Sequence, residues 1–430
     1  MSLVRPRALV PLTASLFAAA FFCAHLIAHA RSSSDSSATS SSSETNVSLA
    51  TEDHIESPGW WPTKSAASLD KFVGTAECAK CHSQIAASQS TTPMAHAATP
   101  AANSEILQSH ADLTEQRAAY HYELSTSRNA VNFSVSDGAQ SLSANIAWAF
   151  GLGHKGQTYI YERDGGFYES HLSFYKSLQS LDLTTGHDAG NPDDLKSAMG
   201  RWLDAGEARR CFGCHTTASS IAGHFDTSHL TPGVQCESCH GPGANHVSAM
   251  KSGKIEQGRA AIFNPRRLNS TASVDFCGAC HRTWADVILA DQKLRSVMNV
   301  RFQPYRLEDS KCWRNSAGDP RLACVACHNP HEQLNQTASS YDAKCLTCHS
   351  SATPENSSAI SLKNSAARFV EKSAAMPRDN SHEKSTPKIC PQSKSNCITC
   401  HMPQVEVPTV HATFFDHHIR IVRPNSSYPL

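Results

Sequence analysis

Seven short stretches of the chain place two cysteines and a histidine in one fixed order, with two residues between the cysteines and the histidine directly after the second. The paired cysteines are Cys78 and Cys81, Cys211 and Cys214, Cys236 and Cys239, Cys277 and Cys280, Cys324 and Cys327, Cys345 and Cys348, and Cys397 and Cys400. The histidines that follow them are His82, His215, His240, His281, His328, His349 and His401. Two thiols at this spacing can bond to the two vinyl groups of a porphyrin, and the adjacent histidine then lies beneath the iron as its proximal ligand. The pattern therefore predicts seven covalently attached haem c groups.

Two other uses of paired cysteines compete with this interpretation. Zinc ribbons and thioredoxin-like redox pairs also contain two cysteines separated by two residues. Zinc sites do not require a histidine after every second cysteine, however, and redox pairs usually occur singly. With this cysteine and histidine content, chance would supply on the order of 0.04 copies of the full motif. Seven copies therefore favour haem attachment.

The composition fits a chain whose interior is partly porphyrin, although it fits ordinary globular proteins nearly as well. Of the 430 residues, 40% are hydrophobic and 7% are aromatic. Lysine plus arginine and aspartate plus glutamate each number 38, so the formal charge is zero. A nucleic-acid-binding role that depends on a basic surface is therefore not expected. Each haem would add two propionates that are ionised at pH 7, which should make the loaded protein acidic.

The N-terminal segment predicts export. Residues 1–30 contain Arg5 and Arg7, then a long apolar stretch, then the small-residue cleavage site Ala28-His29-Ala30, which is the order found in secretory signal peptides. An uncleaved membrane anchor is the alternative, but Pro11 and the cleavage site favour removal. No other stretch is apolar enough to span a bilayer. Because bacteria attach c-type haem outside the cytoplasmic membrane, we expect a periplasmic or cell-surface protein.

Beyond the signal peptide, the pattern predicts a linker and one haem-binding domain. Residues 31–69 are rich in Ser and Thr at their start and are expected to form a disordered linker. Residues 70–430 carry all seven motifs. We expect this domain to be mainly α with much irregular coil, wrapped around haems, with a short helix at each motif from Cys211 onward. The residues at 205–210 and 273–284 are expected to lead helically into the second motif and to carry the fourth.

One long interval without a motif has a different pattern. Between His82 and Cys211, apolar residues alternate with polar ones at Tyr120, Tyr122 and Leu124, which is typical of a half-buried strand. The same alternation recurs at residues 131–135, and Asp164-Gly165-Gly166 separates two further strand-like stretches as a hairpin turn would. We therefore expect a small antiparallel β insertion of four or five strands, at about residues 119–176.

A six-coordinate haem needs a second axial ligand, and the chain has more histidines than seven irons require. Without the signal peptide the chain holds 22 histidines, of which 15 lie outside the motifs. Five stand out by position as distal ligands: His154, His246, His331, His411 and His417. His331 follows its own motif too closely to bind the same iron from the other side, so it is expected to serve a neighbouring haem.

The remaining histidines are weaker candidates. His96 competes evenly with Met94 behind the first motif, and His54 is expected to be exposed in the linker. The others are expected to be ordinary surface or core residues: His110, His121, His171, His187, His224, His229, His382 and His418. The candidates supply six irons readily, and the seventh needs a missed histidine, a methionine or an open position.

Two cysteines of the mature chain lie outside the motifs. Cys312 and Cys390 each precede a motif, and in an oxidising compartment two spare cysteines most simply form a disulfide. The alternative is that one of them is a thiolate ligand to an iron, which would mark an unusual haem.

The motifs and their surroundings resemble the c-554 family of multihaem cytochromes, in a seven-haem bacterial form. The resemblance runs from about Val73 to Pro424. It depends on six stretches: Gly74–His82, Cys211–His215, Pro232–His246, Cys324–His331, Cys397–Pro403 and Asp416–Arg420. It implies haem c electron transfer, mostly with bis-histidine ligation, and little regular structure beyond short helices. It also implies distal roles for His154, His246, His331, His411 and His417. His418 departs from the family pattern beside His417.

Three functions are compatible with these features. The first is an electron carrier that passes electrons between redox partner proteins. The second is a multihaem oxidoreductase that acts on a small nitrogen or sulfur compound at one open or unusually ligated haem. Nitrite reductases of this kind have a motif in which Lys replaces the last His, and none of the seven motifs has it. The third is a binding module in which the β insertion docks a partner. The carrier is favoured, no catalytic residue is assigned, and the sequence does not indicate an oligomeric state.

Overall fold

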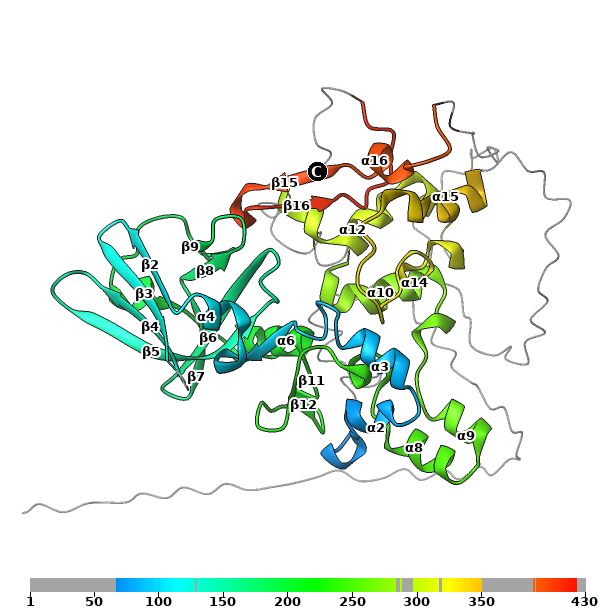
Figure 1. Ribbon diagram of the computed structural model, residues 1–430, viewed down its shortest axis with the longest axis horizontal. Coiled ribbons are helices and arrows are strands. Elements are labelled where there is room, and N and C mark those ends of the chain that lie inside the picture. Colours follow the sequence, from blue (N-terminus) through cyan, green and yellow to red (C-terminus); the bar gives the residue numbers. More distant parts are fainter. Residues whose placement is uncertain are drawn as a thin grey trace, which may run out of the picture. The chain divides into compact units, whose positions relative to one another are not determined.

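A computed structural model of the protein describes residues 67–127, 130–283, 297–316, 319–349 and 392–423, together with Val287 and Cys390. The predicted signal peptide and most of the predicted linker lie outside the described residues, as do His54 and His382. The described residues form one large antiparallel sheet, three two-stranded sheets and many short helices, most of which follow the large sheet in the sequence (Figure 1). No helix among the described residues is long and apolar enough to cross a membrane.

The sheet contains ten strands. They are β1 (Ala98–Pro100), β2 (Asp112–Arg117), β3 (Tyr120–Thr126), β4 (Val131–Ser136), β5 (Ser141–Phe150), β6 (Gly156–Arg163), β7 (Gly166–Ser170), β8 (Leu172–Tyr175), β9 (Ser180–Leu183) and β10 (Gly200–Leu203). The main order is β10-β7-β6-β5-β4-β3-β2, with β1 paired to β5 and β8 paired to both β6 and β9. Most of the connections are therefore hairpins between strands that are adjacent in sequence.

This sheet contradicts the predicted fold class. We expected a mainly α protein with a β insertion of four or five strands at 119–176, and this was wrong: the sheet has ten strands and extends from Ala98 to Leu203. The alternating stretches in β3 and β4 did predict strands. The strands outside the predicted interval are β1, β2, β9 and β10. Three of them give a weak signal, because β1, β9 and β10 have only three or four residues each.

The alternation explains how the central strands form. In β3 and β4 every second residue is buried, among them Tyr122, Leu124 and Phe133, and these side chains join a core of eighteen buried residues on one face of the sheet. The predicted turn between β6 and β7 is confirmed: Asp164 and Gly165 both have positive φ, as a two-residue hairpin turn requires, and Arg163 pairs with Gly166.

The α-helices are short. They are α2 (Thr75–Ala79), α3 (Ser83–Gln89), α4 (Glu105–Ser109), α5 (Leu195–Met199), α6 (Ala205–His215), α7 (Cys236–His240), α8 (Ala244–Lys251), α9 (Ile255–Ala260), α10 (Ser270–His281), α12 (Gln303–Glu308), α13 (Lys311–Asn315), α14 (Cys324–Cys327), α15 (Asp342–His349) and α16 (Cys397–His401). Every haem motif begins within one of them, so the expected motif helices are confirmed. The helices predicted for the second and fourth motifs are α6 and α10.

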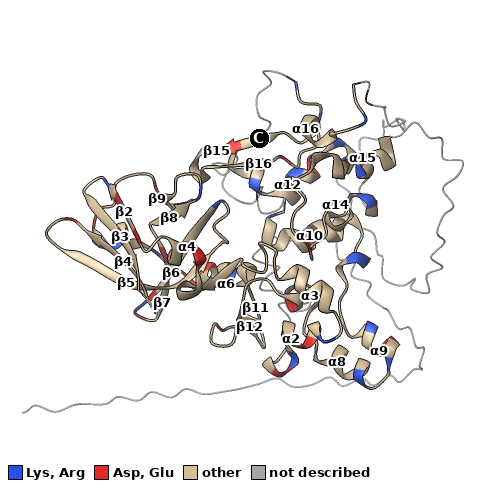
Figure 2. Cartoon of the chain, in the orientation of Figure 1, with Lys and Arg blue, Asp and Glu red and all other residues tan. Residues whose placement is uncertain are grey.

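Smaller elements connect these parts. The 3₁₀ turns are η2 (Leu69–Lys71), η3 (Ala101–Asn103), η4 (Pro265–Arg267), η6 (Val297–Arg301), η7 (Pro320–Leu322), η8 (Ala338–Tyr341) and η10 (Pro408–Val410). Three antiparallel pairs lie outside the sheet: β11 (Thr216–Thr217) with β14 (Thr231–Pro232), β12 (Ser220–Ile221) with β13 (His224–Phe225), and β15 (Gln404–Val407) with β16 (Ala412–Phe415). Acidic and basic residues are interspersed over both the sheet and the helices (Figure 2).

Candidate haem-binding site

Local capping places the second and fourth motifs at the ends of the two longest motif helices. The Asp204 side chain accepts a hydrogen bond from the Glu207 backbone N–H and Glu207 reciprocates, which forms a capping box that starts α6. The Asn269 side chain caps α10 in a similar way. Each helix then runs into its motif and ends at the motif histidine, His215 or His281. The motif geometry therefore follows from local sequence signals.

Three motif histidines each face a second histidine from a distant part of the chain. The ring centres of His82 and His246 are 6.4 Å apart, those of His240 and His331 are 5.9 Å apart, and those of His328 and His417 are 6.1 Å apart. Imidazole–metal bonds are about 2 Å long and the ring centre lies about 1 Å farther, so two histidines on opposite sides of one iron should have ring centres about 6 Å apart. The three separations fit one iron between each pair.

Hydrogen bonds fix which ring nitrogen is left for a metal. Nδ1 of His246 lies 2.8 Å from the Gly258 carbonyl oxygen, and Nδ1 of His240 lies 2.8 Å from that of Phe263. Nδ1 of His417 lies 3.1 Å from the Phe415 carbonyl oxygen. Donation from Nδ1–H to a backbone carbonyl sets the tautomer and leaves Nε2 as the nitrogen for iron.

Two other motif histidines make the same kind of bond. Nδ1 of His215 lies 2.9 Å from the Ala97 carbonyl oxygen, and Nδ1 of His401 lies 2.8 Å from that of Arg420. Burial also lowers the pKa of His215 and His281, and it lowers the pKa of His417 to about 4. His215, His281 and His417 are therefore neutral at pH 7, and a neutral imidazole is the form that binds iron.

The three paired histidines follow a regular order along the chain. His246 follows the third motif and faces the first motif's histidine; His331 follows the fifth motif and faces the third. His417 follows the seventh motif and faces the fifth. Each odd-numbered motif up to the fifth thus meets a histidine that lies two motifs farther on. This arrangement ties distant segments together in pairs.

The first and third motifs are in direct contact. The backbone N–H groups of Val73 and Gly74, just before α2, each donate to the buried Glu237 carboxylate at 2.9 Å. A hydrogen bond with the Cys236 thiol raises the pKa of the Cys78 thiol. The cysteines of the first and third motifs, Cys78 and Cys236, therefore lie side by side.

The second and fourth motifs also lie together. The Cys214 thiol lies 3.6 Å from the Ala279 carbonyl oxygen, and the Cys280 thiol lies 3.9 Å from that of Cys214. A cavity of about 160 Å³ is lined by cysteines of both motifs and by Arg210 and Arg282. Two arginines beside three motif cysteines, Cys211, Cys214 and Cys280, suit the propionates of a haem.

Further contacts extend the series to the remaining motifs. The Cys324 thiol lies 3.9 Å from the Ser273 carbonyl oxygen of α10, which joins the fifth motif to the fourth. The negative charge of Cys345 adds to burial in raising the pKa of the Cys327 thiol, so the sixth motif is near the fifth. Asp342, at the start of α15, accepts hydrogen bonds from the backbone of residues 396 and 397 at 2.7 and 2.8 Å, which joins the sixth motif to the seventh.

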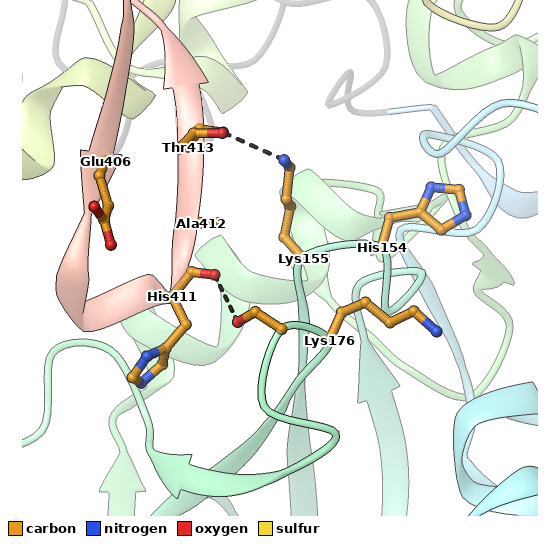
Figure 3. A pocket seen from close by; sticks show the side chains of 8 residues that line it. His154, Lys155, Lys176, Glu406, His411, Ala412 and Thr413 are labelled. Carbon is orange, nitrogen blue, oxygen red and sulfur yellow. Dashed lines mark hydrogen bonds between the residues drawn. The ribbon is translucent and has the colours of Figure 1, made fainter.

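Three of the predicted distal ligands have other surroundings. His96 is exposed and its Nε2 lies 2.8 Å from the Ser90 carbonyl oxygen. His154 and His411 line a hollow of about 320 Å³, where the His154 ring points away from the β15–β16 hairpin (Figure 3). Nε2 of His411 lies 2.8 Å from the Asp182 carboxylate. Among the described residues, no close ring pair joins these three to a motif histidine.

The histidine beside His417 has a separate role. His418 Nδ1 lies 3.4 Å from the Arg306 guanidinium, and Arg306 makes two hydrogen bonds to Asp416, at 2.9 and 3.0 Å. Both members of this ion pair are fully buried. The sequence analysis noted Asp416 only within the stretch Asp416–Arg420 and did not predict its pairing with Arg306, because this pair joins α12 to the C-terminal segment over a long separation.

Cys312 and Cys390 are both free thiols in the described structure. Cys312 lies on α13, and burial raises the pKa of its thiol. Cys390 is exposed, and the backbone N–H groups of residues 393 and 392 lower the pKa of its thiol. The disulfide between them stays a prediction.

The motifs and the histidine pairs have the arrangement expected of a multihaem c-type cytochrome, and parts of the chain are similar to known proteins of that class. The family model described as "Cytochrome c554 and c-prime" matches residues 168–241, which include the second and third motifs. A curated relative, multiheme cytochrome MtrA of Shewanella baltica (strain OS185), is 26% identical over 188 residues. That alignment covers 36% of this chain and 56% of the relative, so the chain spans little more than half of that protein.

One solved structure was also found. The crystal structure of outer cell wall cytochrome OcwA shares 16% sequence identity with this chain, and the comparison covers 49% of this chain and 37% of the other, with a TM-score of 0.29. That similarity is too low to establish a shared fold.

Proposed function

We propose that this protein is an exported seven-haem c-type cytochrome that transfers electrons between redox partner proteins, mostly through bis-histidine haems. The observation that carries the proposal is the set of three histidine pairs whose ring centres lie 5.9–6.4 Å apart, each with one member in a haem motif. Two neutral imidazoles on one iron give a six-coordinate haem that exchanges electrons but leaves no position for a substrate.

The contacts between motifs support transfer along the molecule. The first motif touches the third, the second touches the fourth, and the fourth, fifth, sixth and seventh follow in series. A hydrogen bond with the Cys324 thiol and burial raise the pKa of the Cys277 thiol, and a smaller electrostatic contribution from Cys239 links the third motif to the fourth. The seven attachment points thus form one connected array with the fourth motif at its branch point.

The residues that would hold the cofactors are the seven cysteine pairs and the seven motif histidines, with His246, His331 and His417 as distal ligands. Haem supplies the electron-transfer chemistry when bound, and the protein tunes each potential through ligands, burial and hydrogen bonds. The predicted signal peptide and the oxidising location that haem attachment needs support a place in the periplasm or on the cell surface. The partners are expected to be other redox proteins.

Mass spectrometry and spectroscopy of the mature protein test the proposal. The mass should exceed that of the polypeptide by seven haems, and the ferric protein should be mainly low-spin by electron paramagnetic resonance. A mass without haem would overturn the proposal. One high-spin centre would instead favour the oxidoreductase, because an open iron can bind a substrate.

Each distal ligand can be tested singly. His246→Ala should convert one haem to a high-spin form and leave the number of attached haems unchanged, because the thioether bonds remain. His121→Ala is the matched control, since His121 is exposed on β3 and faces no motif. Identical spectra for the two variants would remove His246 from the ligand set.

A further inference from the structure

Beside the sheet, four charged or titratable side chains form one hydrogen-bonded series that no haem motif contains. Nε of Arg201 donates to Glu169 at 2.8 Å, Nε2 of His187 lies 3.2 Å from the same carboxylate oxygen, and Nδ1 of His187 lies 3.3 Å from Nδ1 of His171. The side chains of Glu169 and His187 are 16% and 5% exposed, and His171 is 4% exposed. Nε2 of His171 is buried and has no hydrogen-bond partner.

The hydrogen bonds determine the protonation of this series. An ionised Glu169 only accepts, so Nε2 of His187 must carry a hydrogen. If His187 is neutral, its Nδ1 accepts and Nδ1 of His171 donates. Nε2 of a neutral His171 is then a buried, unprotonated nitrogen. One added proton would convert the two rings into a shared cation with Glu169 as its counter-ion, so the pair has room for one proton.

Burial lowers the pKa of His171 to about 4, and repulsion by a protonated His187 and by Arg117 adds to this effect. The pair is therefore neutral at pH 7, and the groups around it do not change charge in the range where it takes up a proton. Tyr122 from β3 stacks on His171 with ring centres 5.9 Å apart, and burial raises its pKa to about 12. Burial works to raise the pKa of Glu169, but the His187 hydrogen bond and the Arg201 charge hold it below its usual value. The histidine pair is therefore the titrating unit.

The same series reaches the second haem motif. Arg201 also donates to Glu207 at 2.6 Å, and Glu207 precedes Cys211 by one turn on α6, so both lie on one side of that helix. Cys211 packs in a hydrophobic cluster with Phe167, which points to the same side of β7 as Glu169. The Glu169 charge adds to burial in raising the pKa of the Cys211 thiol, whereas Arg201 and the neighbouring Arg210 lower it.

We propose that the His171–His187 pair takes up one proton from solvent when one electron reaches the haem that Cys211 and Cys214 would attach and whose iron His215 would bind. The electron comes from the neighbouring haem of the fourth motif, itself reduced by a donor protein, and the iron changes from ferric to ferrous. The added negative charge makes the proton more favourable at the pair, and Arg201 and Glu169 carry the electrostatic influence between them. The inference rests on the proposed function, since it needs a haem at the second motif.

Linkage makes the effect reciprocal, so it can be measured as a potential. If reduction raises the proton affinity of the pair tenfold, the midpoint potential of that haem should be about 59 mV higher when the pair is protonated in both redox states than when it is deprotonated in both. Redox titrations of the haem-loaded protein from about pH 4 to about pH 7 would resolve this change at one haem. Dithionite serves as the reductant.

Variants separate the pair from other titrating groups. The pH-dependent change in midpoint potential should be lost in His171→Gln and in Glu169→Gln. It should be retained in His121→Gln, whose side chain is exposed on β3. Haem propionates titrate equally in all four proteins. The proposal would be refuted if the change in midpoint potential persisted in both His171→Gln and Glu169→Gln, or if the unmodified protein did not show it. A protein that holds no haem would instead refute the proposed function.

A second measurement covers the case in which the variants do not fold. Nuclear magnetic resonance of the unmodified protein, with nitrogen-labelled histidine, gives the pKa of the pair directly. A higher pKa in the reduced than in the oxidised protein supports the coupling, and equal values exclude it.

Discussion

The ten-stranded sheet and the segments that carry the haem motifs are held together by different contacts. The sheet encloses a core of eighteen buried residues, among them Tyr122, Phe133 and Phe174. By contrast, the cluster around the fourth motif contains one fully buried side chain, Ala279, with Cys214, Phe276 and Cys280 partly buried around it. The sheet therefore supplies its own apolar interior, whereas the motif segments bury few apolar side chains among themselves.

Helix length leads to the same contrast. The motif helices range from four residues in α14 to twelve in α10. Helices this short are marginal in water unless tertiary contacts hold them. In this protein polar contacts link the motif helices to distant segments, for example Glu237 to the start of α2 and Asp342 to the start of α16. We infer that covalent haem supplies the missing interior of the motif segments.

The largest effect is therefore expected when one haem cannot attach at the branch of the array. The double variant Cys277→Ala and Cys280→Ala should lose one haem by mass and lower the free energy of unfolding by about 4–5 kcal/mol or more. Hydrogen exchange should show faster exchange in α10 and α14 but unchanged protection in β3 and β4. Equal loss of protection in the sheet would show that the two regions are not independent.

The contrast also explains what the sequence could predict. The motifs are local, so the helices of the six motifs from Cys211 onward were predicted, and so were β3, β4 and the turn at Asp164. The extent of the sheet was not, because β1, β9 and β10 are too short to show a clear alternation. Which histidine faces which motif depends on contacts between segments far apart in the chain, so spacing alone proposed His246, His331 and His417 as ligands without assigning them to irons.

The series at Glu169 shows the same limit. His171 and His187 were expected to be ordinary histidines, and neither lies near a motif in sequence. Their link to the second motif passes through Arg201, which faces Glu169 across the β7–β10 pair. Such cross-strand pairing cannot be predicted when β10 itself is missed.

The next largest loss of stability is expected when the buried ion pair between Arg306 and Asp416 is broken. Asp416→Asn removes the closer carboxylate charge from the buried Arg306 guanidinium and leaves it only the more distant Asp309, at 3.8 Å, so the free energy of unfolding should fall by about 3–5 kcal/mol. The exposed pair Arg259–Glu256 is the control, and Glu256→Gln should cost less than about 1 kcal/mol. Chemical denaturation of the haem-loaded variants measures both. Similar losses would mean that burial of the Arg306–Asp416 pair does not matter.

A cavity in the core of the ten-stranded sheet should destabilise the sheet and leave the haem motifs unchanged. Leu124 is fully buried in β3, and Leu124→Ala should cost about 2–5 kcal/mol through lost burial and an unfilled cavity. The number of haems and their potentials should not change. Leu178→Ala serves as the control, because Leu178 is 43% exposed. A change in haem potentials in Leu124→Ala would show that the sheet core and the motifs are coupled.

The smallest effect compares two helix caps, one in each region. Asp194 and Asp204 both form capping boxes, at the starts of α5 and α6, but α5 packs on the sheet core whereas α6 leads into the second motif. Replacing either by alanine should cost about 0.5–2 kcal/mol. Only Asp204→Ala should also shift the potential of one haem, because fraying of α6 moves the attachment site at Cys211.

Removal of a carboxylate near a haem would shift its potential even without fraying, so a third variant is needed. Asp204→Ser removes the charge but keeps a good cap, since a serine hydroxyl accepts the same backbone hydrogen bond. If fraying is the cause, Asp204→Ser should restore both the stability and the potential, measured by thermal unfolding and by redox titration. If it restores stability alone, the potential responds to the charge, and α6 transmits no structural change from the sheet to the motif.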